Sequence, residues 1–254
     1  FEGDSAASAL LATGEKVFAR SFKYHRPRGI LSAGIEEPNA LFTTGSGSTQ
    51  EPNVVATQVE AHNGLCVKTQ NAWPSVHFDL MSVNSLLSPV FVAGFYYKTF
   101  MPSLKGWMFF EHFIRRAAGL GKNDNTPDEN RYDYHNDYVD VLVVGSGIAG
   151  LSAAHAAASS GASVLLVEQD FALGGALLNL PADSDEGVWL DQTIAQLNAM
   201  PNVRCLTRAT AFGLYDGNTM GVIERNHPLA GNAKAGVPKS RFRTVRASAI
   251  VMAA

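Results

Sequence analysis

The pattern of apolar and polar positions divides the chain into three regions, of which the first spans residues 1–70. Alanine and leucine at helical spacing predict a short amphipathic helix over residues 4–13, and β-type runs at 41–43 and 54–59 predict strands. Residues 44–53 are rich in Gly, Ser and Thr, which is a loop composition. The first region is therefore predicted to be a small α+β unit.

The second region, residues 71–136, is predicted to be a connector. Aromatic residues crowd the segment 95–113, and Pro89 and Pro102 prevent one long helix there. A connector that packs over both neighbours would bury these rings, whereas exposed rings would predict a partner surface. Residues 122–136 are polar and charged and predict an exposed linker.

The third region, residues 137–254, has the clearest pattern. Runs at 139–144 and 163–167, which are apolar apart from Asp140 and Ser163, predict strands buried on both faces, and alanine-rich residues 151–160 predict a helix between them. Such a unit favours parallel strands joined by a right-handed crossover. The later predicted elements are a helix at 191–200, a strand at 203–206, short strands within 207–224, and strand-type runs at 241–246 and 249–252.

The turn between the first of these strands and its helix has the sequence Gly145-Ser146-Gly147-Ile148-Ala149-Gly150. Gly145 permits a tight turn, Gly147 lets a pyrophosphate approach the backbone, and Gly150 allows the helix to pack closely on the strand. The start of the helix also presents N–H groups and a positive dipole end to phosphate charge. The motif predicts a dinucleotide site whose cofactor-binding candidates include all six of its residues, with Ser146 and Ile148 among them, and Gly175 further along the chain. The alternative is a tight turn that binds nothing.

Glu168 ends the next predicted strand, where a carboxylate accepts hydrogen bonds from both ribose hydroxyls of an adenosine. It would repel a 2′-phosphate, so NAD or FAD is favoured over NADP. Gly174-Gly175 follows, and such a pair lets the chain pass a cofactor without a side-chain clash, although it also suits an ordinary loop turn. The predicted fold class is α/β, with the Rossmann-like parallel sheet of a two-dinucleotide-binding flavoprotein.

Composition and charge exclude several classes of protein. The net charge is −3, so no basic surface argues for nucleic acid. The two cysteines, Cys66 and Cys205, form no CxxC motif, which excludes a sequence-local zinc or iron–sulfur site. Residues 80–97 are uncharged but contain Ser, Asn, Pro and Gly, so no membrane span is predicted. Sparse cysteine and the lack of a signal peptide favour the cytoplasm.

No catalytic residue is predicted on this chain. His25 lies among Lys23, Arg26 and Arg28, which suits an anion contact or a surface or interface role. No Ser-His-Asp or metal-ligand spacing is present in the sequence, so a cofactor would supply any redox chemistry. The chain starts without Met and ends on an apolar run, so we expect a truncated dinucleotide-binding domain and a fragment that is inactive alone.

Several segments resemble the N-terminal part of the α subunit of heterotetrameric sarcosine oxidases. They are SFKYHRPRG at 21–29, EEPNA at 36–40, FYYKTFM at 95–101, RRAAGLG at 115–121, and the glycine motif with Glu168. The resemblance covers essentially the whole chain and implies that residues 1–70 form a ferredoxin-like domain. Ser32, Glu37 and Ala40 stand roughly where relatives with a cluster have cysteines, so we expect this fold without an iron–sulfur cluster.

The resemblance also implies cofactors and partners. The α subunit would bind NAD, a β subunit would hold FAD and the amine-oxidising site, an FMN would lie near the α–β interface, and γ and δ subunits would complete the heterotetramer. The assembled enzyme would oxidise sarcosine to glycine and release hydrogen peroxide. The implied NAD contacts are Gly145, Gly147, Ala149, Gly150, Glu168, Gln169 and Ala176, with Ala211 as a weaker candidate for a backbone contact to adenine.

Three hypotheses stay open. The chain is an NAD-binding part of a sarcosine oxidase α subunit, or a subunit of a flavin-dependent amine or opine dehydrogenase with FAD in the glycine-loop site, or a structural subunit whose nucleotide pocket is vestigial. The nucleotide that the purified protein binds would distinguish them.

Overall fold

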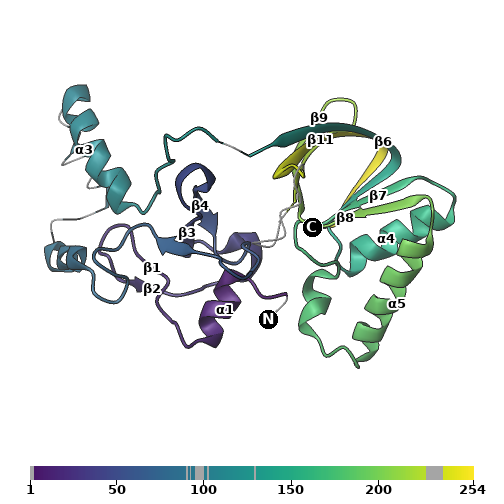
Figure 1. Cartoon of the computed structure of the whole chain (residues 1–254), viewed down its shortest axis with the longest axis horizontal. Coiled ribbons are helices and arrows are strands. Elements are labelled where there is room, and N and C mark those ends of the chain that lie inside the picture. The colour runs from purple at the N-terminus through teal and green to yellow at the C-terminus, as the bar shows by residue number, and fades with distance from the viewer. Residues whose placement is uncertain are drawn as a thin grey trace. The chain divides into compact units, whose positions relative to one another are not determined.

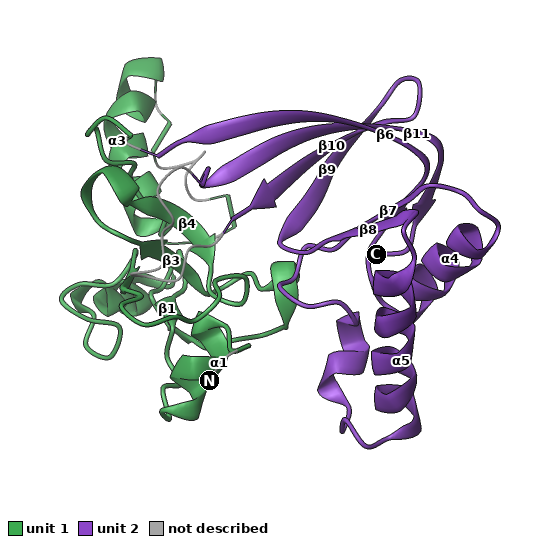
Figure 2. Cartoon of the chain, turned by 45° about the vertical axis from the view of Figure 1, so that its right-hand side comes forward, with its two compact units in different colours: residues 1–129 green, residues 130–254 purple. Residues whose placement is uncertain are grey.

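The structure is a computed structural model that describes residues 3–89, 91, 93, 94, 100, 101, 103–128, 130–226 and 237–254. The chain divides into two compact units, residues 1–129 and residues 130–254 (Figure 2). Residues 71–129 belong to the first unit, so the division into three segments with bounds at 70 and 136 stays a prediction. Residues 95–99 of the aromatic segment lie outside the described residues.

The first unit builds its core where a short helix meets a small sheet. Its elements are α1 (Ala6–Ala12), β1 (Ala19–Arg20), β2 (Pro27–Arg28), η1 (Gly34–Glu36), β3 (Leu41–Thr44), η2 (Gly47–Thr49), β4 (Glu51–Val55), β5 (Val67–Thr69), η3 (Leu80–Leu87) and α3 (Leu104–Ala117), many of which are labelled in Figure 1. Strand β3 lies between β4 and β5 and is antiparallel to both. Phe18 and Phe42 stack with ring centroids 6.2 Å apart in a buried cluster with Ala7, Ala40 and Ala56.

The local pattern predicted three of these elements, namely α1, β3 and part of β4. The helix expected over residues 4–13 forms as α1, and the strand expected at 41–43 forms as β3. The run at 54–59 is a strand only at its start, because the N–H of Gln58 bonds back to the carbonyl of Val55 and turns the chain.

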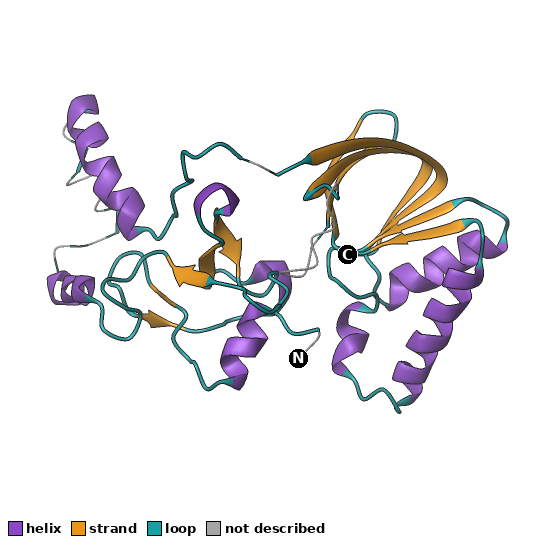
Figure 3. Ribbon diagram, viewed as in Figure 1, coloured by secondary structure: helices purple, strands orange, loops and turns teal. Residues whose placement is uncertain are grey.

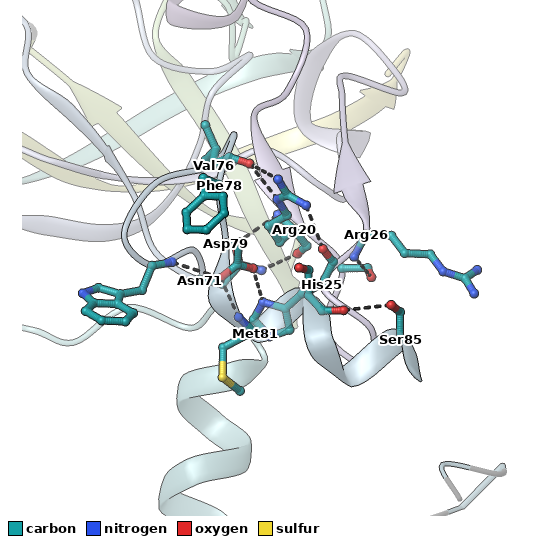
Figure 4. Close-up of polar contacts among 12 residues, drawn as sticks. Arg20, His25, Arg26, Asn71, Val76, Phe78, Asp79, Met81 and Ser85 are labelled. Carbon is teal, nitrogen blue, oxygen red and sulfur yellow. Dashed lines mark hydrogen bonds and ion pairs between the residues drawn. The ribbon is translucent and has the colours of Figure 1, made fainter. Parts of the chain in front are cut away.

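A buried polar cluster joins the region around β1 and β2 to residues 71–81 (Figure 4). His25 is 1% exposed, and its Nδ1 lies 2.6 Å from Oδ2 of Asp79. Oδ1 of Asp79 accepts hydrogen bonds from the backbone N–H groups of Trp73 and Met81. The prediction of a surface or anion-binding His25 is therefore wrong, because its partner comes from a segment 54 positions away that the neighbouring basic residues do not indicate.

The Arg20 side chain binds the same segment through backbone carbonyl groups. Its Nε donates to the Val76 carbonyl at 2.7 Å, Nη2 donates to the His77 carbonyl at 3.0 Å, and Nη1 donates to the His25 carbonyl at 3.1 Å. A guanidinium has five N–H donors and so satisfies several carbonyls at once. These contacts tie residues 71–81 to the small sheets, which explains why the start of the predicted connector belongs to the first unit.

The second unit is a six-stranded sheet with helices α4 and α5 on one face (Figure 3). Its elements are β6 (Tyr132–Val144), α4 (Ile148–Ser159), β7 (Val164–Val167), η4 (Gly175–Asn179), α5 (Asp185–Ala199), β8 (Val203–Leu206), β9 (Ala209–Tyr215), β10 (Thr219–Arg225) and β11 (Ser240–Met252). The strand order is β8-β7-β6-β11-β10-β9, with parallel pairing from β8 to β11 and antiparallel pairing from β11 to β9. The sheet is Rossmann-like, as predicted, but mixed.

Strand β7 and the end of β6 are buried on both faces, as their apolar runs predicted. Val143 and Leu166 face the cluster that includes the two helices, whereas Leu142 and Leu165 face a second cluster on the opposite side of the sheet. All four side chains are fully buried. Within the described residues, no helix is both long enough and apolar enough to cross a lipid bilayer.

Strand β6 begins earlier than the sequence predicted. Residues 132–136 were expected to be linker, yet they pair in parallel with β11 from its first residue, Ser240. An ion network around the buried residues Asp137 and Arg243 accompanies this pairing: Arg243 contacts Asp137 at 2.7 Å and Glu224 at 2.8 Å, and Arg204 contacts Asp137 at 2.7 Å. Residues 132–136, predicted to be linker, are therefore strand residues, and among them Asp133 pairs with Arg241 of β11 at 3.0 Å.

We expect Asp79→Ala to lower the free energy of unfolding by about 3 kcal/mol, because it leaves the buried His25 ring and two backbone N–H groups without their acceptor. The control is Glu111→Ala, which removes an exposed partner of Arg115 and should cost less than about 1 kcal/mol. Urea unfolding of the full chain measures both, and equal effects would contradict a structural role for the buried pair.

Acid should weaken the second unit through Asp137. Burial alone would raise the pKa of this carboxyl, but hydrogen bonds and charges from Arg204 and Arg243 outweigh burial and hold the pKa below its ordinary value. The unfolded chain therefore takes up the proton first, so Asp137 adds stability above its ordinary pKa and loses it as the pH falls through the folded-state pKa.

We expect the unfolding free energy of Asp137→Asn to depend less on pH below about 4 than that of the wild type, because the variant has no carboxyl to protonate at this position. Urea titrations at a series of pH values measure the difference. Parallel pH profiles for the two proteins would show that Asp137 does not contribute to acid sensitivity.

Candidate functional site

The glycine motif forms a turn whose backbone leaves no room for side chains at two positions. Gly145 has a φ of +95°, and a β-carbon there would lie 2.6 Å from the carbonyl oxygen of Ala253, just after β11. A β-carbon at Gly150 would lie 1.9 Å from the carbonyl oxygen of Gly145. The start of α4 therefore packs directly against the end of β6, as the roles predicted for these glycines require.

Gly147 differs from its two neighbours because it faces open space. It is the N-cap of α4 with a φ of −65°, and no described atom lies within 4 Å of the position that a β-carbon would take. The N–H groups in the first turn of a helix have no intrahelical acceptor and sit at the positive end of the helix dipole. The open space beside Gly147 thus adjoins a group of donors suited to an anion such as a phosphate.

Glu168 lies beside this turn and is buried. Its Oε2 accepts hydrogen bonds from the backbone N–H of Ser146 at 2.8 Å and from the Ser146 hydroxyl at 2.6 Å. Its Oε1 accepts a hydrogen bond from the N–H of Asp170 at 2.9 Å. The acid that ends β7 is therefore held against the glycine turn, which is the relation that the spacing of motif and acid predicted.

The Gly174-Gly175 loop lies against the glycine turn at Ser146 and Gly147. The N–H of Gly174 donates to the Ser146 hydroxyl oxygen at 3.0 Å, and a β-carbon at Gly175 would lie 3.2 Å from the α-carbon of Gly147. Both glycines have positive φ angles. The loop thus approaches the glycine turn so closely that a β-carbon at Gly175 would be crowded against Gly147. The sequence did not indicate that Ser146 is the link, although a serine inside the motif is a visible signal.

The remaining predicted contacts divide into exposed and distant residues. Ile148, Ala149, Gln169 and Ala176 are exposed, which leaves them accessible beside the turn and the acid. Ala211 lies instead within β9, opposite Val222, and is partly buried against the core. Strand β9 starts near the acid, since the N–H of Ala209 donates to the backbone carbonyl of Glu168, and Ala211 lies two residues further along this strand.

Comparison with known proteins first defines the class of fold. Residues 140–221 match the FAD dependent oxidoreductase family, which spans β6 to β10 and includes the glycine turn and Glu168. The solved structure of L-proline dehydrogenase from P. horikoshii aligns with 100% of this chain and 37% of its own, with a TM-score of 0.54 and 15% identity. The second unit therefore has the Rossmann-like fold of FAD-dependent oxidoreductases.

Curated relatives then narrow this class. The sarcosine oxidase subunit alpha of Rhizobium meliloti is 46% identical over 99% of this chain, and that of Corynebacterium sp. (strain P-1) is 33% identical over 100%. The chain covers 26% and 22% of these relatives, so it spans about a quarter of their length. The chain is thus homologous along its whole length to sarcosine oxidase α subunits, and the resemblance predicted from its sequence is confirmed.

A further match corrects one prediction. Residues 1–72 match the family of 2Fe-2S iron-sulfur cluster binding domains, so the expectation of a domain without an iron–sulfur cluster is wrong for this family. That expectation rested on Ser32, Glu37 and Ala40, which stand roughly where relatives with a cluster have cysteines, and the cysteine count agreed with it. A plant-type cluster is held by four thiolates, whereas residues 1–72 contain one cysteine, the exposed Cys66. This donor set does not fit such a cluster by itself.

A buried carboxylate organises the loop in which Ser32, Glu37 and Ala40 were singled out. Oε2 of Glu37 accepts from the N–H groups of Leu31 at 2.6 Å and Ser32 at 2.9 Å, and Oε1 accepts from those of Asn39 at 2.7 Å and Ala40 at 3.2 Å. Burial would raise the pKa of Glu37, but these four backbone hydrogen bonds hold it below its usual value. The carboxylate therefore stays charged and fixes the loop.

We expect Gly150→Ala to destabilise the fold by about 2–3 kcal/mol, because its β-carbon would overlap the Gly145 carbonyl and force the helix from the strand. Gly147→Ala is the matched control, since its φ suits alanine and its β-carbon meets open space, and it should change the unfolding free energy by less than about 1 kcal/mol. Urea unfolding tests the pair, and a larger loss for Gly147→Ala would contradict this packing.

Proposed function

We propose that this chain is the dinucleotide-binding part of an oxidoreductase subunit of the sarcosine oxidase type, and that it binds NAD at the glycine turn. The observation that supports the proposal most directly is the open N-terminus of α4 at Gly147 with the buried carboxylate of Glu168 beside it. The open helix N-terminus suits the diphosphate and the carboxylate suits the ribose, and both groups belong to the ADP moiety that NAD and FAD share. The site residues are Gly145, Ser146, Gly147, Ile148, Ala149, Gly150, Glu168, Gln169, Gly175 and Ala176, with Ala211 as an outlying member.

In this proposal each part of the site has a separate task. The turn at Gly147 and the first N–H groups of α4 bind the diphosphate, because no side chain keeps the phosphates away from the backbone. The Glu168 carboxylate accepts a hydrogen bond from the adenosine ribose and repels a 2′-phosphate, so NAD is favoured over NADP. Bound NAD supplies a nicotinamide ring capable of hydride transfer. No residue of this chain is assigned a catalytic role.

The proposed assembly follows from the relatives. Proteins named sarcosine oxidase subunit alpha are subunits of larger enzymes, and this chain matches part of their length. We therefore place the catalytic flavin on a partner β subunit, with γ and δ subunits in the same cytoplasmic complex. The whole enzyme would oxidise sarcosine to glycine with release of hydrogen peroxide.

A second candidate is FAD bound in the same cradle. The family match over residues 140–221 is to FAD-dependent oxidoreductases, and the ADP moiety of FAD would make the same contacts with the turn and the acid. In that case the chain would belong to a flavin-dependent amine or opine dehydrogenase. The two candidates differ in the ligand and agree on the site.

Calorimetric titration of the full chain with NAD, NADP and FAD tests the proposal. We expect NAD to bind and NADP to bind at least about tenfold more weakly. Gly147→Ala should abolish binding while the fold stays intact, and Glu168→Ala should weaken binding by about 1–3 kcal/mol, because a ribose hydroxyl loses a charged acceptor.

The outcomes separate the hypotheses. Tight binding of FAD with no response to NAD would favour the second candidate. If none of the three ligands binds, or if Gly147→Ala binds as well as the wild type, the glycine turn is not the site and the proposal fails. Nucleotide released from the purified protein by heat, identified by its absorbance and mass, gives an independent answer.

A further inference from the structure

The hydroxyl of Ser146 occupies a position between the two loops of the candidate site. It donates to Oε2 of Glu168 at 2.6 Å, and its oxygen accepts the N–H of Gly174 at 3.0 Å. Ser146 is fully buried, so water does not compete for these bonds. If the hydroxyl turned away from Glu168, its hydrogen would lose a charged acceptor, which is costly in a buried place. The hydroxyl is therefore fixed in this direction.

The contacts of Glu168 leave it little capacity for a ligand. An ionised carboxylate has about four acceptor positions, two on each oxygen. Oε2 receives both the N–H and the O–H of Ser146, and Oε1 receives the N–H of Asp170. Three positions are thus filled within the protein, and the fourth lies on Oε1. The sequence suggested that this acid accepts both ribose hydroxyls, but the structure leaves room for one.

We propose that Ser146 is a specificity-determining residue of the dinucleotide site, because its hydroxyl limits Glu168 to one ribose hydroxyl. This inference rests on the proposed function and adds to it which part of the ribose the site recognises. The ligand class is any nucleotide with an ADP moiety, so the inference holds equally for NAD and FAD. The other ribose hydroxyl is recognised elsewhere or not at all by this acid.

The test compares ADP with 2′-deoxy-ADP and 3′-deoxy-ADP as competitors of the bound dinucleotide. For the wild type we expect one deoxy analogue to match ADP within about twofold and the other to bind about tenfold or more weakly, because only one hydroxyl bonds to the charged carboxylate. This comparison needs no variant. Equal losses for both analogues would overturn the proposal.

Ser146→Ala tests the cause. Removal of the hydroxyl frees one acceptor position on Oε2, so Glu168 gains the capacity for both ribose hydroxyls. We expect both deoxy analogues to bind more weakly than ADP to this variant, with the tolerated analogue losing about fivefold or more. An unchanged preference between the analogues would overturn the role of Ser146. A purely structural role would shift all three affinities together and would also overturn it.

Glu168→Gln keeps the failure of this inference distinct from the failure of the proposed function. The amide retains the size of the side chain but removes the charge and one acceptor group. If ADP competes with the dinucleotide in the wild type and Glu168→Gln weakens it, the proposed site stands whatever the deoxy analogues show. If ADP does not compete at all, the proposed function itself is wrong.

Discussion

The packing of the α4 N-terminus against the end of β6 is the constraint on which the candidate site depends. The α-carbon of Gly150 lies so close to the Gly145 carbonyl that a β-carbon would come within 1.9 Å of it. This contact aims the start of the helix at the open space beside Gly147 and brings the turn against the acid that ends β7. Without it, the helix dipole and the first N–H groups would not converge on one place.

The long parallel ladder between β6 and β11 supports this contact from the other side. The two strands pair from Tyr132 with Ser240 to Val144 with Met252, and the N–H of Ala253 then bonds to the carbonyl of Val144. The last residues of this ladder meet Gly145, whose positive φ and close neighbours permit only glycine. The site is thus positioned by residues more than a hundred places apart in the sequence.

Sequence reasoning was accurate where the structure depends on neighbouring residues. Apolar runs marked β7 and β8, and the spacing of the glycines marked the turn, because both are set by local backbone and burial requirements. Prediction from the sequence failed where the interaction partner of a side chain lies far away along the chain. Residues 132–136 at the start of β6 were predicted to be linker, but Asp133 pairs with Arg241 of β11. His25 was predicted to contact an anion or to lie at a surface or interface, but its partner Asp79 lies 54 positions away.

The candidate site itself was predicted in position but not in detail. The motif and Glu168 were found together, yet the two bonds from Ser146 to the acid depend on side-chain directions that spacing does not encode. The outlying position of Ala211 within β9 likewise follows from strand pairing beyond the motif. Local sequence therefore indicates which ligand groups the site suits, and tertiary contacts decide how many hydrogen bonds are left for them.

Two buried carboxylates, Glu37 and Glu168, differ in how many of their hydrogen-bond acceptor positions the protein itself fills. Glu37 accepts four backbone N–H groups, two on each oxygen, which fills its capacity and makes it a fixed part of its loop. Glu168 accepts three hydrogen bonds and keeps one position open. Both acids are similarly buried and both hold a loop, so burial alone does not distinguish them. The unfilled acceptor position is what makes Glu168, and not Glu37, suited to receive a hydroxyl group from a ligand.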